Sequence, residues 1–277
     1  MHIQKKSNFE SKVDCEDLQP TFKYVTSYNR DGRFMTAADI ERTSVNVLKP
    51  IIFIIDGFTD EDKRGDLWSK DLRDAYLEKF VHNVFIVDWN LPSPPDSASI
   101  NEARSAGAIV ADFIETIFIK TGEAYLEIHL VGVSLGYDVA VSAARRLSAS
   151  SRRINRITGL DPSYYLIKNG TGSEGPSTEN SDFVDVVHSN LSRVDETKQI
   201  AQVDFYLDGV GDDCDNSTCG ISNLCVLFAR SVNTKDIKAR KCDNLEDFRK
   251  GACDNKEEVV FGENVAKTAN GKYFVKY

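Results

Sequence analysis

Ser134 lies between two glycines in a pattern that is typical of a catalytic nucleophile. The segment Gly132-Val133-Ser134-Leu135-Gly136 follows the apolar run 128–131, and the residues after it carry apolar side chains at helical spacing. A strand, a G-x-S-x-G turn and a helix in this order predict a nucleophile elbow, because the glycines allow a turn tight enough to expose the serine hydroxyl. The chemistry that such a serine performs is acyl transfer.

Acyl transfer also needs N–H donors for the negative charge that develops on the carbonyl oxygen. The backbone N–H of Leu135 is one candidate, because it lies at the N-terminus of the helix after the serine. Phe58 is the other candidate, since Asp56-Gly57-Phe58 follows an earlier strand and Gly57 permits a turn there. The alternative reading of this segment is an ordinary glycine that ends a strand.

A serine hydroxyl becomes a good nucleophile only when a positioned base accepts its proton and an acid orients that base. Asp161, in Gly159-Leu160-Asp161-Pro162, is a candidate acid, although an aspartate before a proline also starts ordinary turns. The chain has four histidines, and none follows His188. His129 lies inside a strand and His82 precedes one, so structural roles account for both.

Apolar runs of strand length alternate with helical patterns along most of the chain. Buried strands separated by helices predict a mostly parallel sheet with helices on both faces, and we expect one α/β domain over residues 1–277. The segments 91–97 and 162–181 are rich in turn-forming residues and are expected to be surface loops. Strands are expected at 51–55, 83–87, 128–131, 157–160, 183–187 and 203–206, and helices at 67–80, 99–122 and after 136.

Charge and composition narrow the classes of partner. A net charge of −9, from 43 acidic and 34 basic side chains, argues against nucleic acid, which needs clustered Lys and Arg. The longest weakly polar stretch, 106–119, is too short and too charged to span a bilayer, so we expect membrane contact to be peripheral at most. No cofactor or metal is expected, because no cysteine or histidine spacing suits one. The sequence carries no signal for an oligomeric state.

Five of the six cysteines follow residue 213, and their spacing includes no C-x-x-C pair. Disulfides in an oxidising compartment are the favoured interpretation, and reduced thiols in a cytosolic protein are the alternative. Three sequons, at Asn169, Asn190 and Asn216, are compatible with a secreted glycoprotein. We therefore expect secretion, although the sequence shows no signal peptide.

The chain resembles the pancreatic lipase family, which includes lipoprotein and hepatic lipases, insect phospholipases A1 and catalytically inactive insect yolk proteins. The resemblance covers most of the chain and implies an α/β-hydrolase fold. The end of the chain, 271–275, is similar to the last strand of the family's N-terminal domain, so we expect no C-terminal lipid-binding β-sandwich. The matching segments, in family order, are 53–59, 83–89, 128–136, 157–162, 183–188 and 203–206.

This resemblance implies that Ser134 is the nucleophile and Asp161 the acid. The family's histidine lies two residues after a cysteine, ahead of a helix that matches 227–232 here. The alignment therefore places Cys219 at the cysteine and Ile221 at the histidine. Isoleucine cannot accept a proton, so the general base of the family is missing.

Three further positions beside the expected site depart from the family's residues, namely Asp56, Val133 and Tyr137. An ionised carboxylate at Asp56 would oppose the negative charge that develops in the oxyanion hole. Tyr137 is expected to crowd the pocket behind the nucleophile. These departures indicate relaxed catalytic constraint.

The resemblance also implies two disulfides, Cys214–Cys219 and Cys242–Cys253. The first brackets the family's lid and here encloses only residues 215–218, so no lid helix fits. In the family a lid this short accompanies phospholipase A1 character. The cleft is then expected to be open, or filled by side chains such as Tyr164, Tyr165 and Leu166. Cys15 and Cys225 remain, and by parity they could form a third bridge, or either could be free.

Two functional hypotheses follow from these residues. The first is a secreted, non-catalytic lipase homologue that binds a lipid or lipid ester, or serves as a storage or interaction protein. The second is an active carboxylic ester hydrolase, a phospholipase A1 or lipase, that uses Ser134 with a substitute base such as His188. Ile221 favours the first hypothesis, and the retained Ser134 and Asp161 motivate the second. A purely structural protein with a filled pocket is a third reading.

Overall fold

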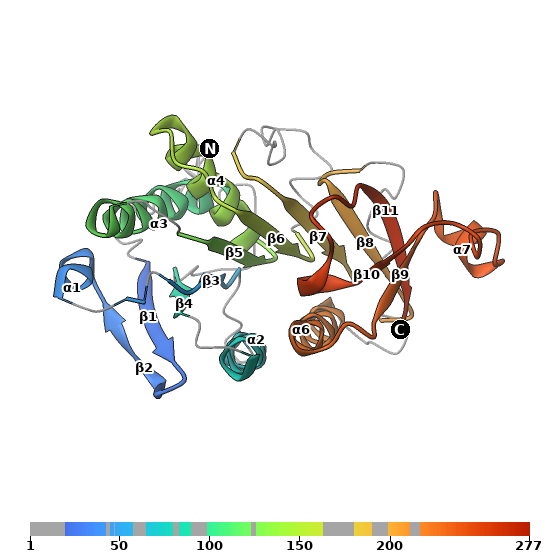
Figure 1. Cartoon of the computed structure of the whole chain (residues 1–277), viewed down its shortest axis with the longest axis horizontal. Helices are drawn as coiled ribbons and strands as arrows, with labels where there is room; N and C mark the ends of the chain where they lie inside the picture. The colour runs from blue at the N-terminus through green and yellow to red at the C-terminus, as the bar shows by residue number, and fades with distance from the viewer. Residues whose placement is uncertain are drawn as a thin grey trace, which may run out of the picture.

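The fold is given by a computed structural model that describes residues 20–42, 45–46, 48–57, 65–79, 83–89, 99–122, 126–162, 180–189, 199–210 and 217–277. The described strands form one eleven-stranded sheet in the order β10-β9-β11-β8-β7-β6-β5-β3-β4-β1-β2. Its centre is parallel, and the expectation of a mostly parallel α/β sheet with helices on both faces is confirmed (Figure 1).

The described parallel strands lie where apolar runs predicted them, except β11, which lies at the segment that the family resemblance suggested. Every residue of four of them is buried, because both faces of the central sheet are covered. The parallel strands are β3 (Ile51–Ile55), β4 (Asn83–Asp88), β5 (Ile128–Val133), β6 (Arg156–Leu160), β7 (Val184–His188), β8 (Val203–Asp208) and β11 (Gly271–Lys276), and the four fully buried ones are β3, β5, β6 and β7.

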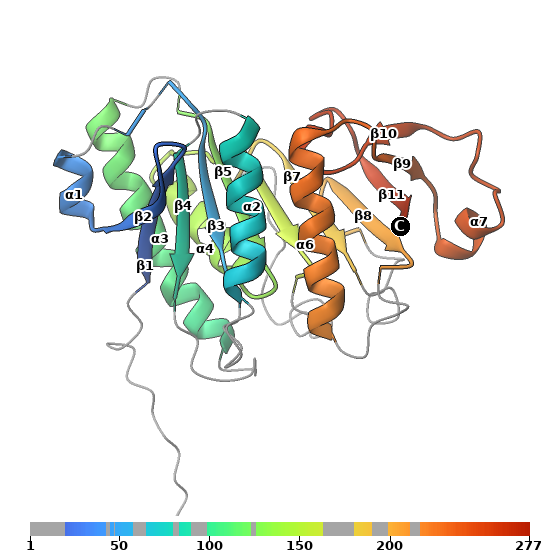
Figure 2. The ribbon, with the colours of Figure 1, turned by 90° about the horizontal axis from the view of Figure 1, so that it is seen from below.

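Two pairs of helices cover the sheet. Helices α3 (Ser99–Thr121) and α4 (Gly136–Ala149) lie on one face, and α2 (Gly65–Lys79) and α6 (Ser217–Asn233) lie on the other (Figures 1 and 2). Successive residues of a strand point to opposite faces of the sheet, so they pack into two separate apolar cores. Phe53 lies in the core on the α3–α4 side, and Ile54 lies in the core on the α2–α6 side. The short helix α1 (Ala37–Arg42) packs against α3. None of the helices in the described residues is long and apolar enough to cross a membrane.

Antiparallel strands extend both edges of the sheet, and the sequence patterns did not predict them. The hairpin of β1 (Thr21–Thr26) and β2 (Asn29–Met35) adds to β4, and β9 (Lys238–Lys241) with β10 (Glu258–Val260) adds beside β11. β2 is mostly exposed, β9 and β10 are short, and β1 is only partly buried, so all four lack the continuous apolar runs that identify buried strands.

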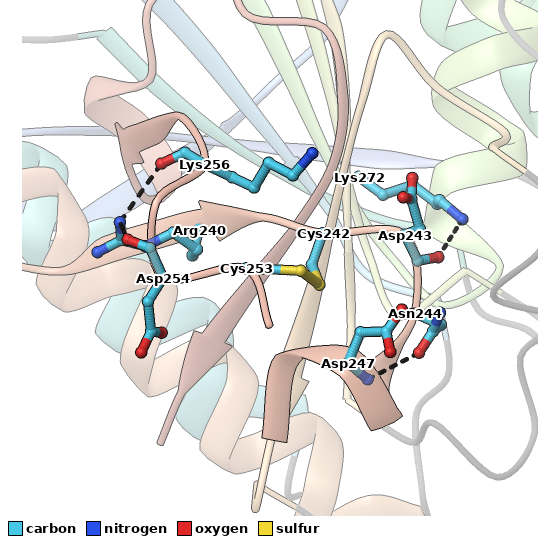
Figure 3. The surroundings of a disulfide bond; sticks show 9 residues. All are labelled: Arg240, Cys242, Asp243, Asn244, Asp247, Cys253, Asp254, Lys256 and Lys272. Carbon is cyan, nitrogen blue, oxygen red and sulfur yellow. Dashed lines mark hydrogen bonds between the residues drawn. A yellow bond between two sulfur atoms is a disulfide. The ribbon is translucent and has the colours of Figure 1, made fainter. Parts of the chain in front are cut away.

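A disulfide fixes the region after α6. Cys242 and Cys253 are bonded, with their Cα atoms 5.6 Å apart (Figure 3). The loop between them holds α7 (Leu245–Arg249), whose N-terminus is capped because the Asn244 side chain accepts a hydrogen bond from the N–H of Asp247. Phe248 of this loop stacks on Phe274 of β11 at 5.4 Å between ring centroids. The segment that follows includes the 3-10 helix η1 (Gly262–Asn264).

Candidate active site

Ser134 occupies the turn between β5 and α4, at the carboxyl end of the central strands. Its φ angle is 52°, in the left-handed region that side chains other than glycine rarely adopt. The N–H of Ser134 donates to the carbonyl of Leu160 at 2.9 Å, which ties the turn to the end of β6. A strained serine at a strand-to-helix turn is the geometry of a nucleophile elbow.

The end of β3 lies directly against this elbow, and two glycines make the contact sterically allowed. A Cβ atom at Gly57 would lie 2.0 Å from the carbonyl oxygen of Val133 and 2.6 Å from the nitrogen of Leu135. A Cβ atom at Gly136 would lie 2.1 Å from the carbonyl oxygen of Ile55. The β3 end and the N–H of Leu135 are therefore adjacent. Phe58, the second donor that the sequence suggests, lies outside the described residues.

Asp161 follows β6 at the same edge of the sheet, with a φ angle of 51°. Its N–H donates to the carbonyl of Val187 at 2.8 Å. One carboxylate oxygen accepts the backbone N–H of Ser189 at 3.2 Å, and the other accepts the Ser189 hydroxyl at 2.8 Å. Ser189 is 3% exposed and directly follows β7. The sequence reasoning missed this residue, although a polar side chain at the end of the next parallel strand was a signal for it.

The position aligned with the family's histidine lies in the first turns of α6. Ile221 is partly buried and packs against the apolar core between the sheet and α2 and α6. At the preceding residue, Gly220, a Cβ atom would lie 3.4 Å from the Ser189 hydroxyl. The turn that carries Ile221 is thus next to the residue that holds Asp161.

His188, the substitute base that the sequence suggests, is engaged elsewhere. Its Nε2 lies 2.9 Å from an oxygen of Asp204, its ring stacks on Tyr206 at 4.7 Å, and the residue is 1% exposed. His129 likewise bonds Thr158 through Nε2 at 2.7 Å. Among the described residues, neither Ser134 nor Asp161 has a hydrogen bond to a histidine side chain.

Asp56 is buried beside the elbow. Its carboxylate accepts the N–H of Gly57 at 3.0 Å, and its carbonyl accepts the indole N–H of Trp89. The Asp56 carboxylate therefore contacts the backbone of the segment directly after β3, where the oxyanion hole is expected.

Two residues in the first turn of α4 complete the surroundings of Ser134. Tyr137 is 6% exposed, and its ring lies so close to β6 that a Cβ atom at Gly159 would be 2.6 Å from it. Asp138 is half-buried, and desolvation of its carboxyl raises the pKa of that group from 3.8 to about 7. A carboxyl that titrates near neutrality four residues after the nucleophile was not anticipated from the sequence.

The cysteines outside the Cys242–Cys253 disulfide divide into three cases. Cys225 is a buried free thiol, so a third bridge between Cys15 and Cys225 is wrong. Burial raises the pKa of the Cys225 thiol well above its ordinary value. Cys219 is in a disulfide whose partner lies outside the described residues. Several other expectations also fall outside them, namely those for Cys15, His82, Tyr164, Tyr165, Leu166, Asn169, Asn190, Cys214 and Asn216.

Comparison with known proteins places this geometry in a family. A family model described as Lipase matches residues 11–267. Lipase member H of Rattus norvegicus is 28% identical over 223 residues, which cover 75% of this chain and 48% of that protein. Pancreatic lipase-related protein 2 of Homo sapiens is 28% identical over 205 residues, which cover 70% of this chain and 43% of that protein.

This chain spans about half the length of the curated relatives it matches. Among solved structures, a hyperthermophilic esterase from the archaeon Pyrobaculum calidifontis has a TM-score of 0.40 and 14% sequence identity, with 76% of this chain and 82% of that chain covered. The family model covers nearly all of the sequence, including the elbow, the acid and the strands between them. The chain therefore belongs to the lipase family, in the group that includes the pancreatic lipases and their relatives.

Proposed function

We propose that this chain is a secreted, non-catalytic member of the lipase family that binds a lipid or lipid ester. In this proposal the fold and the elbow are kept for binding, and the role is that of a carrier, storage or interaction protein. The single observation that carries the proposal is Ile221 at the position of the family's general base.

The chemical argument concerns the serine proton. Ser134 can attack an ester carbonyl at a useful rate only if a neighbouring base removes that proton. In subtilisin, loss of the triad histidine alone lowers kcat by roughly 10⁶-fold, and only binding and the oxyanion hole remain. An isoleucine side chain offers no lone pair, so the same loss is expected here.

The surroundings of the acid support this proposal. Asp161 is bonded by Ser189 rather than by an imidazole, and His188 is directed to Asp204. For His188 to serve as a substitute base, its buried ring would have to leave Asp204 and the stack on Tyr206. The active-hydrolase alternative therefore requires a rearrangement, although it keeps the support of the retained Ser134 and its elbow geometry.

Hydrolysis and binding must be measured on the same preparation. The substrates are a short-chain nitrophenyl ester and phosphatidylcholine in mixed micelles, with Ser134→Ala as the matched control. We expect no turnover above the control and no labelling of Ser134 by a fluorophosphonate. Turnover that disappears in Ser134→Ala would establish the hydrolase alternative instead.

Lipid binding is the second half of the test. Titration with a fluorescent phospholipid analogue should give saturable binding in both the original chain and Ser134→Ala, because the hydroxyl is not needed for it. Absence of both turnover and saturable binding would contradict the lipid-binding role and favour the purely structural reading.

Secretion and glycosylation form part of the same proposal. They are supported by the Cys242–Cys253 disulfide and by a second disulfide at Cys219. Peptide mapping of protein secreted from eukaryotic cells should find glycans at Asn169, Asn190 or Asn216 and a bridge between Cys214 and Cys219. Unmodified sequons together with a free Cys214 would contradict this part.

A further inference from the structure

A buried cluster of charged side chains lies at the amino ends of the parallel strands, at the opposite edge of the sheet from Ser134. His129 is the second residue of β5, Arg156 is the first of β6 and Asp185 is the second of β7. Glu263 joins the cluster from η1. The three strand residues are 5%, 7% and 0% exposed, so their charges have to be balanced inside the cluster rather than by solvent.

Among the described residues of this cluster, two carboxylates face one guanidinium. Arg156 donates to both oxygens of Asp185, at 2.8 Å each, and its guanidinium lies 3.3 Å from an oxygen of Glu263. The bidentate pair of Arg156 and Asp185 is balanced in charge, which leaves the Glu263 carboxylate as a second negative charge. One further positive charge would balance the cluster.

The imidazole of His129 is placed to supply that charge. Its Nδ1 lies 3.5 Å from a carboxylate oxygen of Glu263, and its Nε2 lies 2.7 Å from the Thr158 hydroxyl oxygen. That hydroxyl has a single proton, which it donates to Asp185 at 2.8 Å, so its oxygen is left to accept from Nε2. With Nε2 as a donor, a neutral ring would turn the lone pair of Nδ1 toward a carboxylate, whereas a protonated ring donates from both nitrogens.

The other described groups around His129 are neutral, apart from one cation. Tyr76 of α2 meets the imidazole edge-on, at 6.3 Å between ring centroids, and its hydroxyl donates to Glu263 at 2.8 Å. Burial, followed by the Glu263 carboxylate, raises the pKa of Tyr76 well above its ordinary value, so the phenol stays neutral. Ile52 of β3, paired in register with His129, is apolar. Burial of the ring and the positive charge of Arg156, its register partner on β6, oppose protonation, and the Glu263 carboxylate favours it.

The 3-10 helix η1 joins this cluster to the C-terminal end of α6. The N–H of Glu263 donates to the Ser231 hydroxyl at 2.9 Å, and the Asn264 side chain donates to the Ser231 carbonyl at 2.6 Å. On the other side, Arg156 donates to the backbone carbonyls of Gly262 at 3.1 Å and Glu263 at 2.8 Å. A change in the bonds that Glu263 makes to the sheet is therefore passed to the segment that anchors the end of α6.

We propose that His129 is a pH-sensitive latch, whose protonated ring holds Glu263, and with it η1 and the end of α6, to the centre of the sheet. Loss of the proton removes the ion pair between Nδ1 and Glu263 and loosens η1. A ring that binds its proton more tightly in the folded than in the unfolded chain contributes stability that is fully present below about pH 6.5, the ordinary midpoint of histidine. That stability is lost as the pH rises through the folded-state midpoint. The latch operates whether or not the chain binds lipid.

NMR titration of the His129 imidazole tests the charge balance directly. We expect His129 to keep its proton above about pH 6.5, and Glu263→Gln to lower its proton affinity by about tenfold or more, because the facing carboxylate is gone. Tyr76→Phe is the matched control, since it removes a hydrogen bond to Glu263 but keeps the charge, and it should not lower that affinity. A His129 ring that has already lost its proton at pH 6.5, or equal midpoints in Glu263→Gln and the original chain, would overturn the proposal.

Hydrogen exchange and unfolding test the conformational effect. Exchange of the Glu263 amide, corrected for its intrinsic pH dependence, should quicken above the His129 midpoint in the original chain and should be quick at every pH in His129→Gln. Urea unfolding is best compared in an Asp138→Asn background, because the Asp138 carboxyl also titrates at about pH 7. There we expect a loss of stability between about pH 6 and 8 that His129→Gln abolishes.

If His129→Gln fails to fold, Glu263→Gln serves for the same comparison of unfolding across pH. An equal loss of stability with and without the substitution would refute the latch. So would exchange of the Glu263 amide that does not follow the titration of His129.

Discussion

Ser189 holds the carboxylate of Asp161 with both of its donors, the backbone N–H at 3.2 Å and the hydroxyl at 2.8 Å. Each carboxylate oxygen therefore has a partner without any imidazole. Burying a carboxylate is costly unless such bonds are made. These two bonds therefore give the Asp161 carboxylate polar partners that do not depend on a histidine.

Removing the Ser189 hydroxyl should destabilise the fold. Ser189→Ala leaves one oxygen of Asp161 without its donor, and a hydrogen bond to a charged group contributes about 1.5–3 kcal/mol. Urea unfolding at neutral pH would measure the difference, with Ser189→Thr as the control that keeps a hydroxyl. Equal free energies of unfolding for Ser189→Ala and the original chain would show that the bond contributes nothing.

Restoring a base should restore some chemistry if the rest of the site is competent. Ile221→His places an imidazole on the α6 turn beside Ser189, and a positioned general base contributes about 10²–10⁴-fold in rate. We expect ester hydrolysis above that of the double variant Ile221→His/Ser134→Ala. A folded single variant with no gain would mean that the other departures, such as Asp56 and Tyr137, also disable the site.

Asp138 should make stability fall as pH rises. Burial raises the pKa of its carboxyl from 3.8 to about 7, so the folded state binds more protons than the unfolded state between these values. The contribution of Asp138 to the free energy of unfolding is fully present below pH 3.8. It is lost as the pH rises to about 7, and the loss is on the order of 4 kcal/mol.

Asp138→Asn should remove this dependence. The amide stays neutral, so the variant should be more stable than the original chain at pH 8 and similar to it at pH 4. Unfolding by urea across this range would measure the slope. Asp236→Asn is the matched control, because that residue is exposed. Parallel pH profiles for Asp138→Asn and the original chain would contradict the prediction.

Arg156 should be among the most sensitive residues of the sheet. Its guanidinium makes two bonds of 2.8 Å to Asp185 and lies 3.3 Å from Glu263, inside the α2–α6 face. Arg156→Met would leave a buried carboxylate uncompensated, at a cost of about 3–5 kcal/mol.

The exposed pair of Arg153 and Asp182, at 2.9 Å, provides the control. Arg153→Met should cost less than about 1 kcal/mol, because solvent screens that pair. Thermal or urea unfolding of both variants would test the contrast. A similar loss of unfolding free energy in Arg156→Met and Arg153→Met would show that burial does not determine how much these ion pairs contribute to stability.

The amino-acid sequence alone is enough to predict the central architecture and the elbow. Continuous apolar runs identify strands that are buried on both faces, and β3, β5 and β6 lie where those runs are. The glycines around Ser134 indicate a tight turn through local backbone sterics, which need no knowledge of distant residues. The absence of a histidine after His188 is likewise a property of the sequence alone.

The contacts between polar groups, in contrast, follow from the tertiary arrangement of the strands. Ser189 and Asp161 are 28 residues apart, and the pairing of β6 with β7 brings them together. Strand order also directs His188 to Asp204. The antiparallel strands β1, β2, β9 and β10 were not predicted, because partly exposed strands carry no continuous apolar run. Local sequence sets backbone conformation, whereas hydrogen-bond partners across a sheet depend on the order of the strands, which no local pattern encodes.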